Sequence, residues 1–204
     1  MRFLLYCILL VWIFMACTSA PHTLPKLGEM DIVNGDTIYH QIPAFSFTDQ
    51  YGDTITEKTL AGKIYVTDFF FTKCPTICPK MSKQMLRLHE KYSGEKNMLL
   101  ISHSIDSKYD TTATLKQYAV KLGVGDTKFW HFLHIPKDEL NHIAREYLAS
   151  VQRDTLTAGG FTHTGHFILV DGDRHIRSFC DGTKPEEVDR LMHDIDQLLN
   201  EYKK

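Results

Sequence analysis

The segment KIYVTDFFFTKCPTICP, residues 63–79, carries the strongest structural signal in this chain. Its first nine residues are nearly all β-branched or aromatic, which is typical of a strand buried on both faces of a sheet. Two cysteines and two prolines follow directly, and the next residues place Met81, Met85 and Leu88 on one face of a helix. The segment therefore predicts a central strand, a short cysteine loop and the start of a helix.

Strands and helices alternate on both sides of this segment. We predict further strands at 44–48, 97–105, 166–171 and 176–181, and helices at 79–91, 112–122, 138–147 and 185–202. A strand, a helix and a strand followed by a hairpin and a final helix form an α/β sandwich of thioredoxin type. The predicted fold is thioredoxin-like, with a central mixed β-sheet flanked by α-helices.

The composition is that of one ordinary globular domain with a leader. The chain has 204 residues, of which 43% are hydrophobic and 24% charged, so it can bury a substantial core. Its formal net charge of -2 gives no electrostatic attraction for nucleic acid. We therefore expect no binding to DNA or RNA.

The N-terminal residues 1–16 predict export. Arg2 precedes an apolar run over 3–15, which has the pattern of a secretory signal and is shorter than the roughly 20 apolar residues of a transmembrane helix. Ala16 and Cys17 at its end resemble a bacterial lipoprotein signal, in which the cysteine is diacylated. We expect a lipoprotein anchored to a membrane through Cys17 and facing the periplasm or another extracytoplasmic space. The alternative is an uncleaved N-terminal signal anchor.

Residues 17–40 contain several prolines and glycines and show no clear apolar period. Such a segment predicts a tether between the membrane anchor and the folded domain. No repeat or second linker follows, so residues 41–204 are expected to form a single thioredoxin-like domain.

Cys74 and Cys78 are the candidate chemical centre because they sit where the strand ends and the helix begins. The unpaired N–H groups and the dipole of a helix N-terminus favour thiolate. Thioredoxin-like redox enzymes place two residues between their cysteines, whereas three residues leave room for a metal ion. Soft thiolates select Cu(I), and an added imidazole accommodates Cu(II) as well. Zinc accepts the same atoms, but a structural zinc site normally uses four protein ligands.

His163 is the candidate third ligand. It lies just before the predicted strand 166–171, whose start comes near the first helix in a thioredoxin-like sheet. Redox enzymes of this fold carry a proline at about this point, and the nearest prolines here are Pro136 and Pro185. A histidine in that place favours metal ligation over oxidoreduction.

Three segments resemble the SCO/SenC family of copper-binding oxidase assembly proteins. DFFFTKCPTICP (68–79) is similar to the family's cysteine signature, and HTGHFILVD (163–171) to its histidine segment. SIDSKYDT (104–111) is similar to the family's Asp-Pro-Glu-Arg-Asp-Thr segment, with Ser107 in place of the proline. The resemblance extends over roughly residues 41–200.

The resemblance implies that one copper ion, as Cu(I) or Cu(II), is bound by Cys74, Cys78 and His163. It implies a metallochaperone whose partner is subunit II of cytochrome c oxidase, or another copper-site protein. The alternative is a thiol–disulfide reductase that uses Cys74 and Cys78 to keep the oxidase's copper-site cysteines reduced, so enzymatic activity stays open. A peroxidase is a weaker interpretation, since no separate peroxidatic cysteine with a supporting arginine is evident. Thr162 replaces an aspartate that many family members carry before the histidine, which affects the support of the imidazole.

Other chemistry-bearing residues have simpler interpretations. Met81 and Met85 have the spacing of core residues, and Cys180 acts as a small hydrophobic residue in a strand. Asp106 and Asp110 are expected to shape a turn and cap the helix after it, with partner recognition as the alternative.

The remaining histidines near predicted strands have structural interpretations too. His166 follows His163 by three residues, and we expect its side chain to point elsewhere on the strand and not to serve as a ligand. We expect hydrogen-bonded histidines at the end of the sheet, namely His103, His131 and His134.

Overall fold

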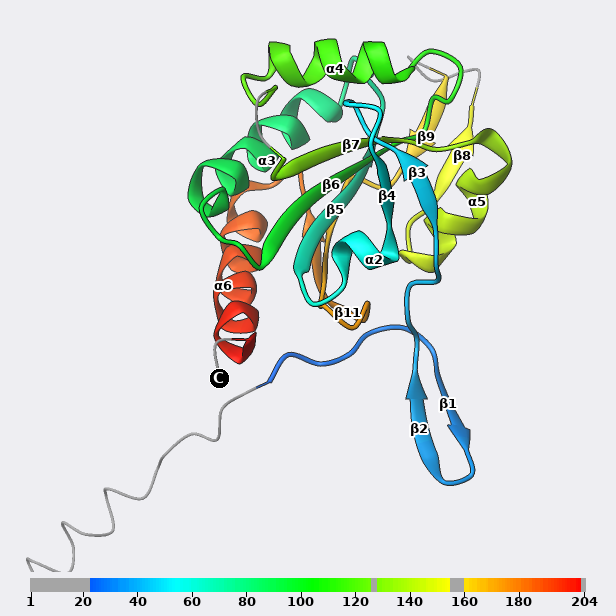
Figure 1. Cartoon of the computed structure of the whole chain (residues 1–204), viewed down its shortest axis with the longest axis vertical. Coiled ribbons are helices and arrows are strands. Elements are labelled where there is room, and N and C mark those ends of the chain that lie inside the picture. Colours follow the sequence, from blue (N-terminus) through cyan, green and yellow to red (C-terminus); the bar gives the residue numbers. More distant parts are fainter. Residues whose placement is uncertain (1–22, 126–127, 155–159, 203–204) are drawn as a thin grey trace, which may run out of the picture.

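The computed structural model describes residues 23–125, 128–154 and 160–202. Its centre is a mixed sheet of seven strands in the order β11-β10-β5-β6-β7-β3-β4, with helices on both faces (Figure 1). The predicted thioredoxin-like fold with a central mixed sheet is confirmed.

The middle of the sheet is β5 (Ile64–Phe70), in which all seven residues are buried. It runs parallel to β6 (Met98–Ser104), which in turn runs parallel to β7 (Trp130–His134). On its other side β5 pairs antiparallel with β10 (His166–Val170). Both faces of β5 are covered, which explains why its sequence is a continuous apolar and aromatic run. The strand therefore delivers the cysteine loop to the carboxyl end of the parallel strands.

The edges of the sheet are antiparallel. β11 (Ile176–Asp181) pairs with β10, and β3 (Ser46–Thr48) connects β7 to the edge strand β4 (Thr54–Thr56). A one-turn helix, α2 (Glu57–Leu60), follows β4, and Thr56 caps it with a capping box.

Three helices cover one face of the sheet: α3 (Cys78–Tyr92), α4 (Thr112–Lys121) and α6 (Pro185–Tyr202). Ser82 of α3 hydrogen-bonds Tyr118 of α4, whose ring packs on Phe70 of β5.

The opposite face is covered by α5 (Lys137–Glu146) and the residue that ends it. Tyr147 packs against Tyr65 and Phe69 of β5. Successive side chains of β5 therefore enter the two hydrophobic layers in turn.

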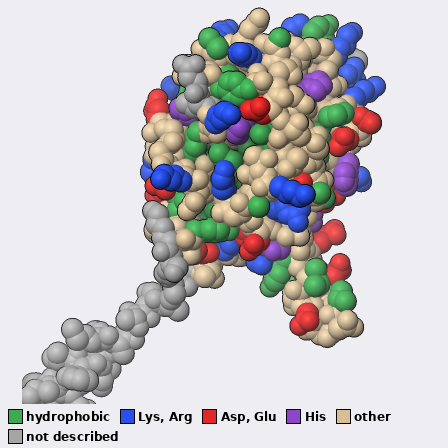
Figure 2. All heavy atoms as spheres, in the orientation of Figure 1, with side chains coloured by type: hydrophobic (Ala, Val, Ile, Leu, Met, Phe, Trp, Pro, Cys, Tyr) green, Lys and Arg blue, Asp and Glu red, His purple; other side chains and the backbone are tan. Residues whose placement is uncertain are grey.

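Two short ribbons lie outside the main sheet. One is the hairpin of β1 (Met30–Val33) and β2 (Asp36–Tyr39), which projects away from the body (Figures 1 and 2). All eight of its strand residues are exposed. The other pairs β8 (Val151–Arg153) with β9 (Phe161–His163) next to α5.

The hairpin lies within residues 17–40, the segment predicted to be a tether, and its two strands were not expected. The sequence does contain a hairpin signal, the Asn34-Gly35 pair. Both residues adopt positive φ, as a two-residue hairpin turn requires. β7 was also missed, since its histidines interrupt an apolar pattern.

Among the described residues, none of the helices has the length and apolarity needed to cross a bilayer.

Candidate metal centre

The cysteine loop connects β5 to α3 and bends sharply at its start. The Cys74 N–H donates to the Phe71 carbonyl at 3.1 Å. Cys78 is the first residue of α3, and Pro79 occupies a first-turn position where its missing N–H removes no helical hydrogen bond. Both sulfurs therefore lie at the N-terminal end of α3, and both cysteines are buried and free of disulfide bonds. That end of a helix favours negative charge on sulfur.

The structure brings His163 to these sulfurs. His163 ends β9, and its Nε2 lies 3.7 Å from Cys78 Sγ. The ligand atoms of Cys74, Cys78 and His163 all lie within 4.8 Å of one another, close enough to hold one metal ion together. As the sequence predicted, His163 lies just before the strand that begins at His166. It also ends β9 of the separate β8–β9 ribbon, which pairs with no strand of the main sheet among the described residues.

The imidazole is oriented by the backbone and by aromatic neighbours. His163 Nδ1 lies 3.2 Å from the Thr164 carbonyl oxygen, so this nitrogen is the donor and Nε2 keeps its lone pair for the metal side. The Phe71 ring stands edge-on to the imidazole at 6.0 Å and packs on Phe161 at 5.4 Å. Thr162 points elsewhere, since its hydroxyl donates to Asp154 at 3.3 Å. The Thr164 carbonyl thus supports the imidazole, although Thr162 replaces the aspartate that many family members carry before this histidine.

Asp110 ties the cysteine loop to the sheet. Its carboxylate accepts hydrogen bonds from the Thr72 N–H at 3.0 Å, the Thr72 hydroxyl at 2.5 Å and the Ser104 hydroxyl at 2.6 Å. The expectation that Asp110 caps a helix is wrong, because Thr111 is the N-cap of α4 and accepts from the Thr114 N–H. Sequence spacing gives no sign of this contact, which spans 38 positions.

The two thiols differ in their readiness to ionise. The hydrogen bond from Cys78 is the largest influence that lowers the pKa of Cys74, and His163 adds to it. The same hydrogen bond, followed by burial, raises the pKa of Cys78. The pair therefore favours a Cys74 thiolate with the shared proton on Cys78.

A buried carboxyl lies on β5 under this pair. Burial raises the pKa of Asp68 to about 6, although the Ser102 hydroxyl donates to it at 2.5 Å and opposes the rise. The charge of Asp68 also contributes to the raised pKa of Cys78, and His163 partly opposes the rise in the pKa of Asp68.

The sulfurs are reached through a cavity of about 390 Å³ beside α3 and α4. Cys74 and Cys78 line it together with Tyr118, Lys83 and Lys121. None of the described lining residues belongs to the β8–β9 ribbon, so the sulfurs are accessible from the side of α3 and α4.

The simpler interpretations of several residues are confirmed. Met81 and Met85 are core residues with exposures of 1% and 0%, and Cys180 is buried in β11. Asp106 shapes its turn by accepting from the N–H groups of Tyr109 and Asp110.

The other histidines do not join the cluster. His166 lies against the Phe179 ring, and His131 and His134 bond Asp49 and the Asp110 carbonyl from inside β7. His103 bonds Thr67 through Nδ1, but its buried Nε2 has no partner among the described residues, which corrects the expectation of a fully hydrogen-bonded histidine.

The signal segment 1–16 and Cys17 lie outside the described residues and stay predictions.

Comparison with known families gives this geometry a context. The model of the SCO1/SenC family matches residues 36–200, which is most of the chain. The chain belongs to the SCO1/SenC family.

Among SCO1/SenC relatives, the SCO1 protein homolog of Bacillus subtilis is 26% identical over 162 residues, covering 78% of this chain and 83% of that one. The crystal structure of a SCO1/SenC family lipoprotein from Bacillus anthracis is 26% identical, has a TM-score of 0.70, and covers 78% of this chain and 95% of that chain. The structure of Bradyrhizobium japonicum ScoI with copper bound is 25% identical, has a TM-score of 0.61, and covers 76% and 98% of the two chains.

Proposed function

We propose that this protein binds one copper ion through Cys74, Cys78 and His163 and delivers it to the dinuclear copper centre of cytochrome c oxidase subunit II. The observation that carries the proposal is the meeting of two sulfurs and one imidazole nitrogen within 4.8 Å. The Sco family is a family of cytochrome c oxidase assembly proteins, and the Bradyrhizobium relative has been seen with copper bound.

The donor set fits copper chemically. Two thiolates suit Cu(I), and the imidazole also accommodates Cu(II). The three residues have separate roles, since Cys78 is buried at the helix start, Cys74 carries the favoured thiolate, and His163 is held by the Thr164 carbonyl. Three protein ligands leave a position for a partner's thiolate, so the metal can pass by ligand exchange. Because thiol ligands must be deprotonated, affinity should fall in acid.

The proposal also includes the location of the protein in the cell. We propose that the mature chain is anchored to a membrane by a diacylated Cys17 and faces an extracytoplasmic space. The apolar leader and its terminal cysteine support this, with an uncleaved signal anchor as the alternative. Mass spectrometry of the purified protein separates the two, since a lipoprotein begins at Cys17 and carries the mass of its acyl chains.

The copper site is tested with two variants, each of which replaces a single histidine by alanine. Purified reduced protein should bind one copper ion and, with Cu(II), show intense sulfur-to-copper charge-transfer absorption. His163→Ala should lose this band and weaken binding by more than the roughly 10–100-fold typical of losing a supporting residue. His166→Ala is the matched control, three positions along and outside the cluster, and should keep both properties. Absence of binding in the wild type removes the proposal.

The second candidate is a thiol–disulfide reductase, favoured by the lowered pKa of Cys74. The Cys74 thiolate would attack a disulfide of the partner, and Cys78 would then release the partner as a dithiol while the Cys74–Cys78 disulfide forms. An external thiol reductant regenerates the pair. His163→Ala should abolish copper binding but leave most of this exchange, so an exchange rate lost with copper binding contradicts the reductase.

A further inference from the structure

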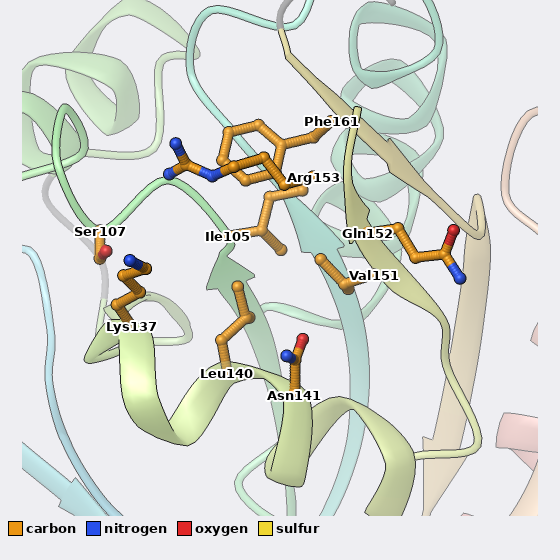
Figure 3. A pocket seen from close by; sticks show the side chains of 9 residues that line it. All are labelled: Ile105, Ser107, Lys137, Leu140, Asn141, Val151, Gln152, Arg153 and Phe161. Atoms are coloured by element: carbon orange, nitrogen blue, oxygen red, sulfur yellow. The ribbon is translucent and has the colours of Figure 1, made fainter. Parts of the chain in front are cut away.

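A second cavity, of about 490 Å³, adjoins the β8–β9 ribbon on the side of α5. We call it the basic pocket and show its lining in Figure 3. Its lining residues come from the turn after β6, from α5 and from the ribbon: Ile105, Ser107, Lys137, Leu140, Asn141, Val151, Gln152, Arg153 and Phe161. Neither cysteine lines this cavity, so it is distinct from the opening over the sulfurs.

The basic pocket has an apolar floor and a cationic rim. Ile105 and Leu140 are buried beneath it, while Lys137 and Arg153 are exposed. In Figure 3 the charged ends of Lys137 and Arg153 lie on the same side of the cavity as Ser107. Two positive charges beside buried apolar side chains suit a ligand that carries a carboxylate next to an apolar group.

Neither cation is neutralised within the described part of the chain. Lys137 and Arg153 form no salt bridge there, and Arg153 lies 5.3 Å over the Phe161 ring instead. None of the described residues that line the cavity is acidic.

The nearby acidic residues in sequence are placed elsewhere. Asp154 accepts from Thr162, Asp106 accepts from the Tyr109 N–H, and the first-turn residues Asp138 and Glu139 of α5 are outside the lining. None of these carboxylates forms a salt bridge with Lys137 or Arg153 in the described part of the chain, so both cations are available to an incoming anion.

The wall of the basic pocket is the ribbon that carries His163. Val151 pairs with His163 in the ribbon, and Arg153 pairs with Phe161. Phe161 also packs on Phe71, whose ring faces the imidazole. A ligand in the basic pocket would therefore contact the same two strands that carry the metal-binding nitrogen.

We propose that the basic pocket docks an acidic loop of the protein that exchanges copper with this chain. This inference rests on the proposed function, because the ribbon that forms one wall of the pocket also carries His163, a proposed copper ligand. The pocket presents exposed cations and a broad apolar floor, and no buried charged side chain to orient a small molecule. Its volume falls within the roughly 300–1,000 Å³ of ligand sites and accepts a few side chains of a loop.

The role of Lys137 and Arg153 in docking is tested with the soluble copper-binding domain of an oxidase subunit II as the probe. Both the association of the copper-free proteins and the rate of copper transfer are measured. Lys137→Glu with Arg153→Glu should slow transfer and weaken association roughly tenfold at low ionic strength, and salt should reduce the difference. Lys58→Glu with Lys96→Glu makes the same change of charge at exposed lysines outside the lining, and should change both quantities much less.

The shape part is tested by filling the cavity without changing charge. Asn141→Trp on α5 should weaken association as well, with copper affinity unchanged. His142→Trp places the same side chain at the next exposed position of α5, outside the lining, and should have little effect. Retained helicity and melting temperature establish that both variants fold.

The outcomes separate this inference from the proposed function. If the wild type associates with the probe but transfers no copper, the delivery role fails while docking is still read from association. If transfer proceeds and both pocket variants match their controls, the docking proposal is overturned and the delivery role stands. Docking is also overturned if the wild type does not associate with the probe.

Discussion

The two halves of the metal centre are built differently. The cysteine half follows the central strand of the sheet and is buried; two hydrogen bonds from Thr72 tie it to Asp110, and a third joins Asp110 to Ser104 of β6. The histidine half is carried by β8 and β9, two strands of three residues each outside the main sheet. A two-stranded ribbon has little stability of its own. Two sulfurs are therefore fixed by the core, whereas the imidazole depends on a few contacts of a surface ribbon.

This difference suits a protein that releases its metal. Displacing the ribbon breaks few buried contacts, whereas displacing the cysteine loop disrupts the Asp110 network and the start of α3. Under the proposed delivery role, copper would keep its two sulfur ligands while the imidazole dissociates and rebinds. Three variants test this contrast between the halves, beginning with the one that should change the protein most.

Asp110→Ala should lower the free energy of unfolding by about 3 kcal/mol, because it leaves the Thr72 and Ser104 donors without their acceptor. Urea unfolding of the copper-free protein measures this. Asp154→Ala is the counterpart on the ribbon, where the carboxylate accepts from Thr162 at an exposed position, and should cost less than about 1 kcal/mol. Equal losses would remove the distinction between the two halves.

Asp68→Asn should remove a pH dependence that belongs to the cysteine half. The folded pKa of Asp68 is raised from 3.8 to about 6 by burial. The folded state therefore binds this proton more tightly, and the resulting stability is present below the unfolded pKa and lost as pH rises through 6. The difference between wild type and variant should change by up to about 3 kcal/mol between pH 3.5 and 7.5. Unfolding of both proteins across that range measures it, and parallel curves would contradict the assignment.

Phe161→Ala should weaken copper binding about tenfold, or about 1.4 kcal/mol, because the ribbon loses its contact with Phe71. Competition with a copper chelator gives the affinity. Phe179→Ala removes another partly exposed ring, which lies on β11 and packs on His166 instead of Phe71, and should leave the affinity unchanged. An unchanged affinity in Phe161→Ala would show that the ribbon is held by other contacts.

The sequence predicted the cysteine half far better than the histidine half. A buried strand, two cysteines and a helix start are local signals, because each depends on residues close together in the chain. The ribbon depends on pairing between Val151 and His163, and its three-residue strands give no periodic pattern. The β1–β2 hairpin was missed for a different reason: its Asn34-Gly35 turn was visible, but the exposed apolar residues around it have no core to face.

Residue patterns were enough to predict the thioredoxin-like fold and to single out the three candidate ligands, and the short motifs around those ligands carried the resemblance to the SCO/SenC family that implies their role. The way in which the ligands are held emerged with the folded domain. The acceptor for Thr72 is Asp110, 38 positions away, and the support for the imidazole is a backbone carbonyl whose direction no side chain reveals. The basic pocket likewise exists where the turn after β6, α5 and the ribbon meet. Contacts between distant segments are set by packing of the whole domain, which residue spacing does not encode.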